Sequence, residues 1–178
     1  RNSAMALMVE SKIHQIPIVD ANFELCGLHL FDEASFIEAK GNTFFILAGG
    51  LGTRLRPLTD QLPKPMVKVD GTPMLEHIIN RAKGEGFRKF VISVGYLGSI
   101  IEEYFKDGSG FGVEIAYLRE SKPLGTAGSL KLLNPIPDMP ILISNADVIT
   151  DVQYGEILDF HIQHDAFATM ATRAHEIV

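Results

Sequence analysis

The sequence has one cysteine, Cys26, and no long hydrophobic run among its 178 residues. A single cysteine cannot form an intramolecular disulfide, and without a run of about 20 apolar residues no helix can span a bilayer. The apolar stretch at residues 5–9 is also too short for a secretory signal, because Glu10 and Lys12 follow it. We therefore expect a cytoplasmic protein with no membrane partner.

Positive charge is also scarce, since 16 Lys and Arg face 22 Asp and Glu for a net charge of -6. This balance argues against a broad surface for nucleic acid, so any phosphate must be bound locally. With 46% hydrophobic residues the chain should fold as one globular domain plus a small segment. Because it starts with Arg1 rather than Met, we expect it to begin inside a longer protein.

The opening segment reads as a small α/β piece that ends near residue 41, where Gly41 and Asn42 interrupt the pattern. Periodicity and turn residues predict its elements. They are helices at 4–10 and from Asp32, and strands at 14–19 and 24–30 around a turn at 20–22.

Strand-like and helix-like stretches alternate after residue 41. The expected strands are 43–48, 90–94, 113–118, 141–144 and 167–172, and the expected helices are 74–82, 100–105, one from Thr126 and 154–164. This alternation predicts an α/β fold, a Rossmann-like and mostly parallel sheet with helices on both faces. In such folds ligands bind at the carboxyl ends of the strands.

A loop rich in glycine and cations follows the first strand of the larger domain. Its glycines are Gly49, Gly50 and Gly52, and its cations are Arg54 and the nearby Lys64. Glycine lets backbone N–H groups approach phosphate oxygens, while the two cations suit a polyphosphate. The alternative is a flexible loop of turn glycines, which rarely carries so many cations.

Two familiar phosphate motifs do not fit this loop. A P-loop needs a Gly-Lys pair that the loop lacks, and a dinucleotide fingerprint needs a third glycine where Leu55 stands. The loop therefore belongs to another class of phosphate site.

A second motif, 120–128, lies between a predicted strand and a predicted helix. Thr126 can cap that helix, and Gly125 and Gly128 allow close approach of a flat ring or a neighbouring strand. Taken alone, the stretch fits an ordinary strand-to-helix turn better than a binding site, because threonine caps and loop glycines are common.

A third motif ends the strand at 141–144 with the carboxylate Asp147. This position suits an acid that holds a Mg²⁺ ion touching substrate phosphates, or one that merely caps the next turn, and the residues alone leave both open. Asp151 is interpreted as a solvated loop acid. His161 and His164 are taken as surface histidines, because no third metal ligand lies in range.

Together, Ala-Gly-Gly-Leu-Gly-Thr-Arg-Leu-Arg-Pro-Leu-Thr at 48–59 and Pro-Lys-Pro at 63–65 resemble the signature of sugar-1-phosphate nucleotidyltransferases. The resemblance runs from about residue 43 to the end. It implies an enzyme that joins a nucleoside triphosphate to a sugar-1-phosphate and releases pyrophosphate. It also implies roles for individual residues. The nucleotide is bound by Ala48, Gly49, Gly50, Gly52, Thr53, Gly125 and Thr126, with Glu120 a weaker candidate. Arg54 assists pyrophosphate departure, Lys64 binds phosphates and Asp147 holds Mg²⁺.

The stretches 123–128 and 145–149 are most similar to the mannose-1-phosphate guanylyltransferase branch of this family. The resemblance favours GTP with mannose-1-phosphate or glucosamine-1-phosphate, and leaves thymidylyl, uridylyl, cytidylyl and adenylyl transfer open. Members of the family have further core strands beyond residue 178, so we expect a C-terminally incomplete fold with little or no turnover and with apolar surface that favours a homo-oligomer. The alternative is a non-catalytic regulatory module that binds a nucleotide or nucleotide-sugar.

The opening segment has a resemblance of its own. Met8, Ile13, the run Ile-Pro-Ile-Val-Asp at 16–20 and Leu-Cys-Gly-Leu at 25–28 are similar to the second half of a CBS regulatory module. Such modules pair and often bind adenine nucleotides. We therefore expect a partial CBS-type module over 1–40 and a nucleotide-binding domain over 41–178.

Overall fold

The computed structural model describes residues 8, 11–30, 37–122 and 124–172. Its contacts divide the chain into two compact units, residues 1–38 and residues 39–178. None of the helices among the described residues is long and apolar enough to cross a membrane.

The first unit contains an antiparallel pair of strands. β1 (Gln15–Val19) and β2 (Leu25–Leu30) are joined by a turn in which the Asp20 carboxylate accepts backbone hydrogen bonds from Asn22 and Glu24. Both strands occur where the sequence predicts them. The helices expected at 4–10 and from Asp32 lie outside the described residues, apart from Met8, which is helical.

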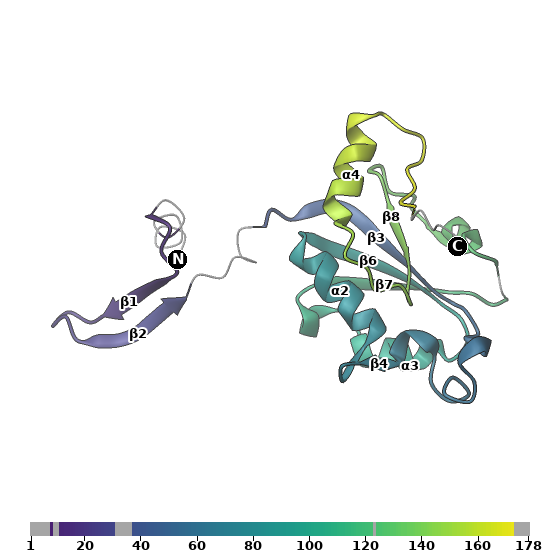
Figure 1. Ribbon diagram of the computed structural model, residues 1–178, viewed down its shortest axis with the longest axis horizontal. Coiled ribbons are helices and arrows are strands. Elements are labelled where there is room, and N and C mark those ends of the chain that lie inside the picture. The colour runs from purple at the N-terminus through teal and green to yellow at the C-terminus, as the bar shows by residue number, and fades with distance from the viewer. Residues whose placement is uncertain (1–7, 9–10, 31–36, 123, 173–178) are drawn as a thin grey trace, which may run out of the picture. The chain divides into compact units, whose positions relative to one another are not determined.

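The second unit is built on a four-stranded sheet (Figure 1). Its strands are β3 (Lys40–Ala48), β6 (Phe87–Val94), β7 (Glu114–Arg119) and β8 (Leu142–Asn145). They lie in the order β7-β6-β3-β8, and every neighbouring pair is parallel. The predicted α/β class with a parallel central sheet is therefore confirmed.

Helices and short turns connect these strands. The helices are α2 (Met74–Gly84), α3 (Gly98–Phe105) and α4 (Tyr154–Gln163), and a small hairpin pairs β4 (Lys68–Val69) with β5 (Thr72–Pro73). Helix α2 carries Glu76 in its first turn and Arg81 and Lys83 in its last. These charges oppose the helix dipole at both ends and stabilise the helix.

The core of this unit centres on Phe44. Its ring packs edge-on against Phe87 and Tyr154, with centroid distances of 5.3 and 4.9 Å. Buried residues of α2, α3 and α4 all join this cluster, together with alternate residues of β3. The opposite face of the sheet holds Phe45, which is fully buried, and Ile143, which is 45% exposed. The two faces are therefore covered unequally.

The predicted helix from Thr126 is wrong, because the chain forms only a 3-10 turn, η5 (Gly128–Leu132). Pro135 and Pro137 prevent any helix here from continuing past Asn134. The predicted strand at 167–172 is also wrong, since none of the described strands pairs with it and Phe167 is fully exposed.

Strand β3 begins earlier than expected. It starts at Lys40, and its pairing with β6 is irregular between Lys40 and Thr43. Asn42 is 4% exposed, and its amide donates a hydrogen bond to the Pro140 carbonyl at 2.8 Å. This bond satisfies a buried polar side chain and fixes the entry to β8, so Asn42 belongs to the sheet rather than to a linker.

Candidate functional site

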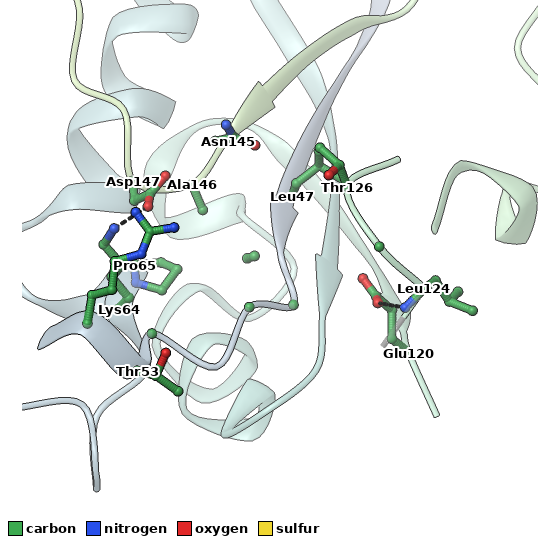
Figure 2. Close-up of a pocket in the computed structure, with 16 residues that line it drawn as sticks. Leu47, Thr53, Lys64, Pro65, Glu120, Leu124, Thr126, Asn145, Ala146 and Asp147 are labelled. Atoms are coloured by element: carbon green, nitrogen blue, oxygen red, sulfur yellow. Dashed lines mark hydrogen bonds and ion pairs between the residues drawn. The ribbon is translucent and has the colours of Figure 1, made fainter. Parts of the chain in front are cut away.

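A cleft of about 520 Å³ lies at the carboxyl ends of the parallel strands (Figure 2). The glycine loop leaves β3 there, the 120–126 segment leaves β7, and Asp147 follows β8. The structure brings together in its lining every site residue expected from the sequence. These are Ala48, Gly49, Gly50, Gly52, Thr53, Arg54, Lys64, Gly125, Thr126 and Asp147.

Backbone hydrogen bonds extend the sheet beyond its strands and deliver two carboxylates to the cleft. The Glu120 amide donates to the Val94 carbonyl at 2.8 Å, and the Ala146 amide donates to the Leu47 carbonyl at 3.1 Å. Each bond fixes the residue at which the chain leaves the sheet. Glu120 is therefore held directly by the sheet, and Asp147 is held through Ala146, the residue before it, rather than by a free loop.

The glycine loop is closed by a buried threonine. Gly52 has φ of +63°, which favours glycine, and it precedes the 3-10 turn η2 (Thr53–Leu55). Thr59 is 1% exposed, and its hydroxyl donates to the Gly52 carbonyl at 2.9 Å. This hydrogen bond holds the end of the loop at Gly52 against Thr59.

Gly49 is favoured for a different reason, namely close approach. A Cβ atom at this position would lie 2.6 Å from Oε1 of Glu120, closer than real Cβ contacts allow. The loop therefore packs its backbone directly on the Glu120 carboxylate.

Lys64 and Asp147 form an ion pair in the cleft. Lys64 opens the 3-10 turn η3 (Lys64–Met66), whose Pro65 and Met66 are buried anchors. Its Nζ atom donates to Oδ2 of Asp147, and the two side chains remain 33% and 31% exposed. Arg54, in η2, is exposed and adds a second cation to the lining. This part of the cleft can receive an anion such as a polyphosphate.

The other end of the cleft is marked by Glu120. Its Oε1 accepts a hydrogen bond from the Ser93 hydroxyl at 2.6 Å, and its Oε2 accepts one from the Leu124 amide at 3.2 Å. Figure 2 shows this carboxylate well apart from the Lys64–Asp147 pair, with the loop after Leu47 between them. The cleft therefore has a cationic end and an acceptor end.

The donor set of the cleft fits a metal ion that arrives with phosphates. Within the described residues no group of three or more His, Cys, Asp or Glu side chains gathers into a metal cage. Asp147 offers one carboxylate, and Mg²⁺ commonly binds through one or two carboxylates together with waters and substrate phosphates. His161 instead contacts the Thr169 hydroxyl at 3.0 Å, and His164 contacts the Phe160 carbonyl at 2.8 Å.

Three polar residues at or beneath this cleft were not among the site residues expected from the sequence. Asn145 lines it at the end of β8, Thr59 closes the loop, and Ser93 holds Glu120. Ser93 does carry a sequence signal, because it interrupts the apolar run Phe-Val-Ile-Ser-Val. A hydroxyl buried in such a strand needs a hydrogen-bond partner.

The chain is similar to several known proteins. A family model described as Nucleotidyl transferase matches residues 44–176. A mannose-1-phosphate guanyltransferase of Yarrowia lipolytica is 42% identical over 136 residues, which cover 74% of this chain and 38% of that protein. A UTP–glucose-1-phosphate uridylyltransferase of Synechocystis is 36% identical over 140 residues, covering 72% of this chain and 36% of that protein.

A solved structure shares the fold of the second unit. The crystal structure of HddC from Yersinia pseudotuberculosis complexed with GMP-PN aligns with a TM-score of 0.61 and 27% identity, covering 68% of this chain and 54% of that chain. The chain spans little more than a third of the length of the curated relatives named above. The family match begins at residue 44, so the CBS-type module at 1–40 stays a prediction.

Proposed function

Because this chain belongs to the nucleotidyl transferase family, we propose that it transfers a nucleotidyl group from a nucleoside triphosphate to a sugar-1-phosphate. One observation carries this proposal. The glycine loop, the cations Arg54 and Lys64, and the carboxylate Asp147 line one cleft, although they come from separate segments of the chain. That combination matches a triphosphate bound with a divalent cation.

In the proposed reaction an oxygen of the sugar-1-phosphate attacks the α-phosphorus of the triphosphate. The bond from this phosphorus to the oxygen that bridges to the β-phosphate breaks, and its electron pair leaves with pyrophosphate. No nucleophile from the protein is needed, so catalysis consists of positioning and charge stabilisation.

Different residues of the cleft position the phosphates and stabilise their charge. Backbone N–H groups of the loop at 49–53 bind phosphate oxygens, Arg54 stabilises the charge on departing pyrophosphate, and Lys64 stabilises charge at the α-phosphate. Asp147 is the residue that would hold Mg²⁺, which supplies further neutralisation of phosphate charge. The free Lys64–Asp147 pair keeps both groups in the cleft before substrate arrives.

We propose GTP as the nucleotide, and Glu120 supports this choice. An ionised carboxylate only accepts hydrogen bonds, and guanine offers two adjacent donors, N1–H and the 2-amino group. Uracil and thymine offer a single N–H between two carbonyl oxygens, which a carboxylate repels. The Yarrowia lipolytica relative and the GMP-PN complex of HddC are consistent with guanine.

We propose mannose-1-phosphate as the acceptor, with glucosamine-1-phosphate as the second candidate. The name of the Yarrowia lipolytica relative supports mannose. The uridylyltransferase of Synechocystis has a similar sequence and a different named substrate, so both substrates must be tested directly.

The decisive experiment measures pyrophosphate release in Mg²⁺ from GTP, UTP, dTTP, CTP and ATP with each sugar phosphate. We expect release with GTP and one sugar from a version of the chain extended at its C-terminus, because the chain itself spans little more than a third of its curated relatives and is expected to turn over poorly. Arg54→Ala should lower the rate by about a hundredfold, as loss of one charge-stabilising group does, and leave GTP binding within a few-fold. Arg56→Ala is the matched control, because Arg56 pairs with Asp60 at 3.4 Å and does not line the cleft.

Two results would count against the proposal. Equal rates in the two arginine variants would remove Arg54 from the reaction. Tight GTP binding without pyrophosphate release from any sugar phosphate, in the extended version as well as in this chain, would favour the non-catalytic binding module instead.

A further inference from the structure

Ser93 is a fully buried polar residue in the middle of β6. Its neighbours along the strand, Ile92 and Val94, belong to the hydrophobic core. A buried hydroxyl is costly unless it is hydrogen-bonded, and Ser93 donates to Oε1 of Glu120 at 2.6 Å. Because the acceptor is a carboxylate, this is a strong, charge-assisted bond.

The Glu120 carboxylate is held from three directions. Ser93 binds one oxygen, the Leu124 amide binds the other, and the Gly49 backbone packs against the group. Its backbone amide is also fixed, by the Val94 carbonyl at 2.8 Å. Each carboxylate oxygen accepts one of these hydrogen bonds and can accept another, so the group can still bind a ligand in the cleft.

We propose that Ser93 is a positioning residue for base selection, which rests on the proposed function of the cleft as a guanine nucleotide site. Ser93 fixes the orientation of the Glu120 carboxylate before the nucleotide binds. A fixed carboxylate meets the N1–H and 2-amino donors of guanine without the entropy cost of ordering a free side chain. The ligand class that this favours is a 2-amino-6-oxopurine nucleoside triphosphate.

The test compares the binding of GTP, ITP and inorganic tripolyphosphate to this chain. ITP lacks the 2-amino group, and tripolyphosphate lacks the base. Ser93→Ala should weaken GTP binding by about 2–10-fold, the range expected when one more side chain must be ordered on binding. It should leave tripolyphosphate binding unchanged and bring the GTP/ITP ratio towards one.

Ser144→Ala is the matched control. Ser144 lies in β8, and its hydroxyl donates to the Asn145 carbonyl at 3.1 Å rather than to Glu120. We expect this variant to keep the GTP/ITP ratio of the original protein. Ser93→Thr, which retains the hydroxyl, should also keep it.

The outcomes distinguish a failure of the guanine site from a failure of the role of Ser93. If the original protein binds GTP and ITP equally, or binds neither, the proposed guanine site itself is wrong. If the original protein prefers GTP and Ser93→Ala keeps that preference, only the role of Ser93 is overturned. An equal loss for all three ligands would reduce Ser93 to a purely structural residue. Should the alanine variant fail to fold, Ser93→Cys replaces it, because a thiol is a weak donor of similar size.

Discussion

Lys64 donates a hydrogen bond from Nζ to the Asp147 carboxylate, across 83 residues of sequence. The two groups neutralise each other at the end of the cleft that we propose for phosphates. A nucleotide that arrives with a divalent cation can replace this pair by two new ones, Lys64 with phosphate and Asp147 with the metal. In the free site, the Lys64 ammonium and the Asp147 carboxylate therefore pair with each other, so neither charge is left without a partner.

Asp147→Asn should separate the two roles of Asp147, as the ion partner of Lys64 and as the residue that would hold the metal. Without metal, the variant should bind GTP about fivefold more tightly, because a negative charge near the phosphates is removed and Lys64 loses its ion partner. With Mg²⁺, the gain in affinity that the metal gives should shrink. Titration calorimetry in EDTA and in Mg²⁺ measures both effects.

Asp151→Asn is the control for this prediction, since Asp151 is exposed and does not line the cleft. Asp151→Asn should change neither the metal-free affinity for GTP nor the affinity in Mg²⁺. An unchanged metal-free affinity in Asp147→Asn would mean that Asp147 lies outside the reach of the phosphates, and a weaker one would mean that its main role is to hold Lys64 in place.

Much of the second unit could be predicted from sequence because local patterns and tertiary structure agree there. The apolar run at 43–48 and the helical spacing of Met74, Leu75, Ile78 and Ile79 each lead to the element observed. The carboxyl ends of parallel strands meet at one edge, so three separate motifs could be expected in one site.

The errors come from features that local pattern does not encode. The stretch at 167–172 has strand composition, yet a strand needs a hydrogen-bonded neighbour and finds none among the described strands. Likewise, the partners of Lys64 and Glu120 come from distant segments of the chain. Spacing can place such residues at the same edge of the sheet, but only the three-dimensional structure pairs them.

Gly49→Ala should destabilise the fold by about 1–3 kcal/mol, because the added methyl group would push the Glu120 carboxylate off its hydrogen bonds with Ser93 and the Leu124 amide. Gly50→Ala is a close control from the same loop, since a Cβ atom there has no neighbour within 4 Å. We expect a change of less than about 1 kcal/mol for it, with stabilisation possible through a less flexible unfolded chain. Urea unfolding of both variants measures the difference.

A double-mutant cycle identifies the cause of the Gly49 effect. In a Glu120→Ala background the obstacle is gone, so the cost of Gly49→Ala should become smaller. An unchanged cost would show that the clash with Glu120 is not the cause.

Tyr117 should give the protein a pH-dependent stability above pH 10. Burial, helped by the negative charges of Glu102 and Asp107, raises the pKa of Tyr117 to about 12. An unfolded tyrosine has a pKa near 10, so between about pH 10 and 12 the unfolded chain loses this proton first and the free energy of unfolding falls. Below about pH 10 both states keep the proton and this contribution is constant.

Tyr117→Phe tests this prediction by urea unfolding at pH 8 and at a series of values above pH 10. At pH 8 the variant should be less stable by about 1 kcal/mol, because the phenol donates to the Lys106 carbonyl at 2.7 Å. Above pH 10 the difference in free energy of unfolding between the two proteins should diminish, because the original protein loses the stability that Tyr117 contributes. The pKa values of Tyr104 and Tyr154 are also raised, so the variant keeps part of the alkaline decline. Parallel curves for the two proteins would contradict the assignment to Tyr117.

Glu85, at the end of α2, should stabilise the start of α4. Its Oε2 accepts a hydrogen bond from the Gly155 amide at 2.7 Å, one of the first-turn N–H groups of α4 that no residue of the same helix can satisfy. Its other oxygen lies 3.6 Å from Nε of Arg81, which is in the last turn of α2, so the carboxylate also forms an i,i+4 ion pair within α2. We expect Glu85→Ala to lower the free energy of unfolding by about 1–2 kcal/mol, the usual cost of removing a cap.

Glu85→Gln keeps an acceptor but loses the charge that favours a helix N-terminus, so its loss of stability should be smaller. Faster amide hydrogen exchange at Gly155 in the alanine variant would locate the effect, whereas unchanged exchange there would assign the loss of stability to Arg81 instead.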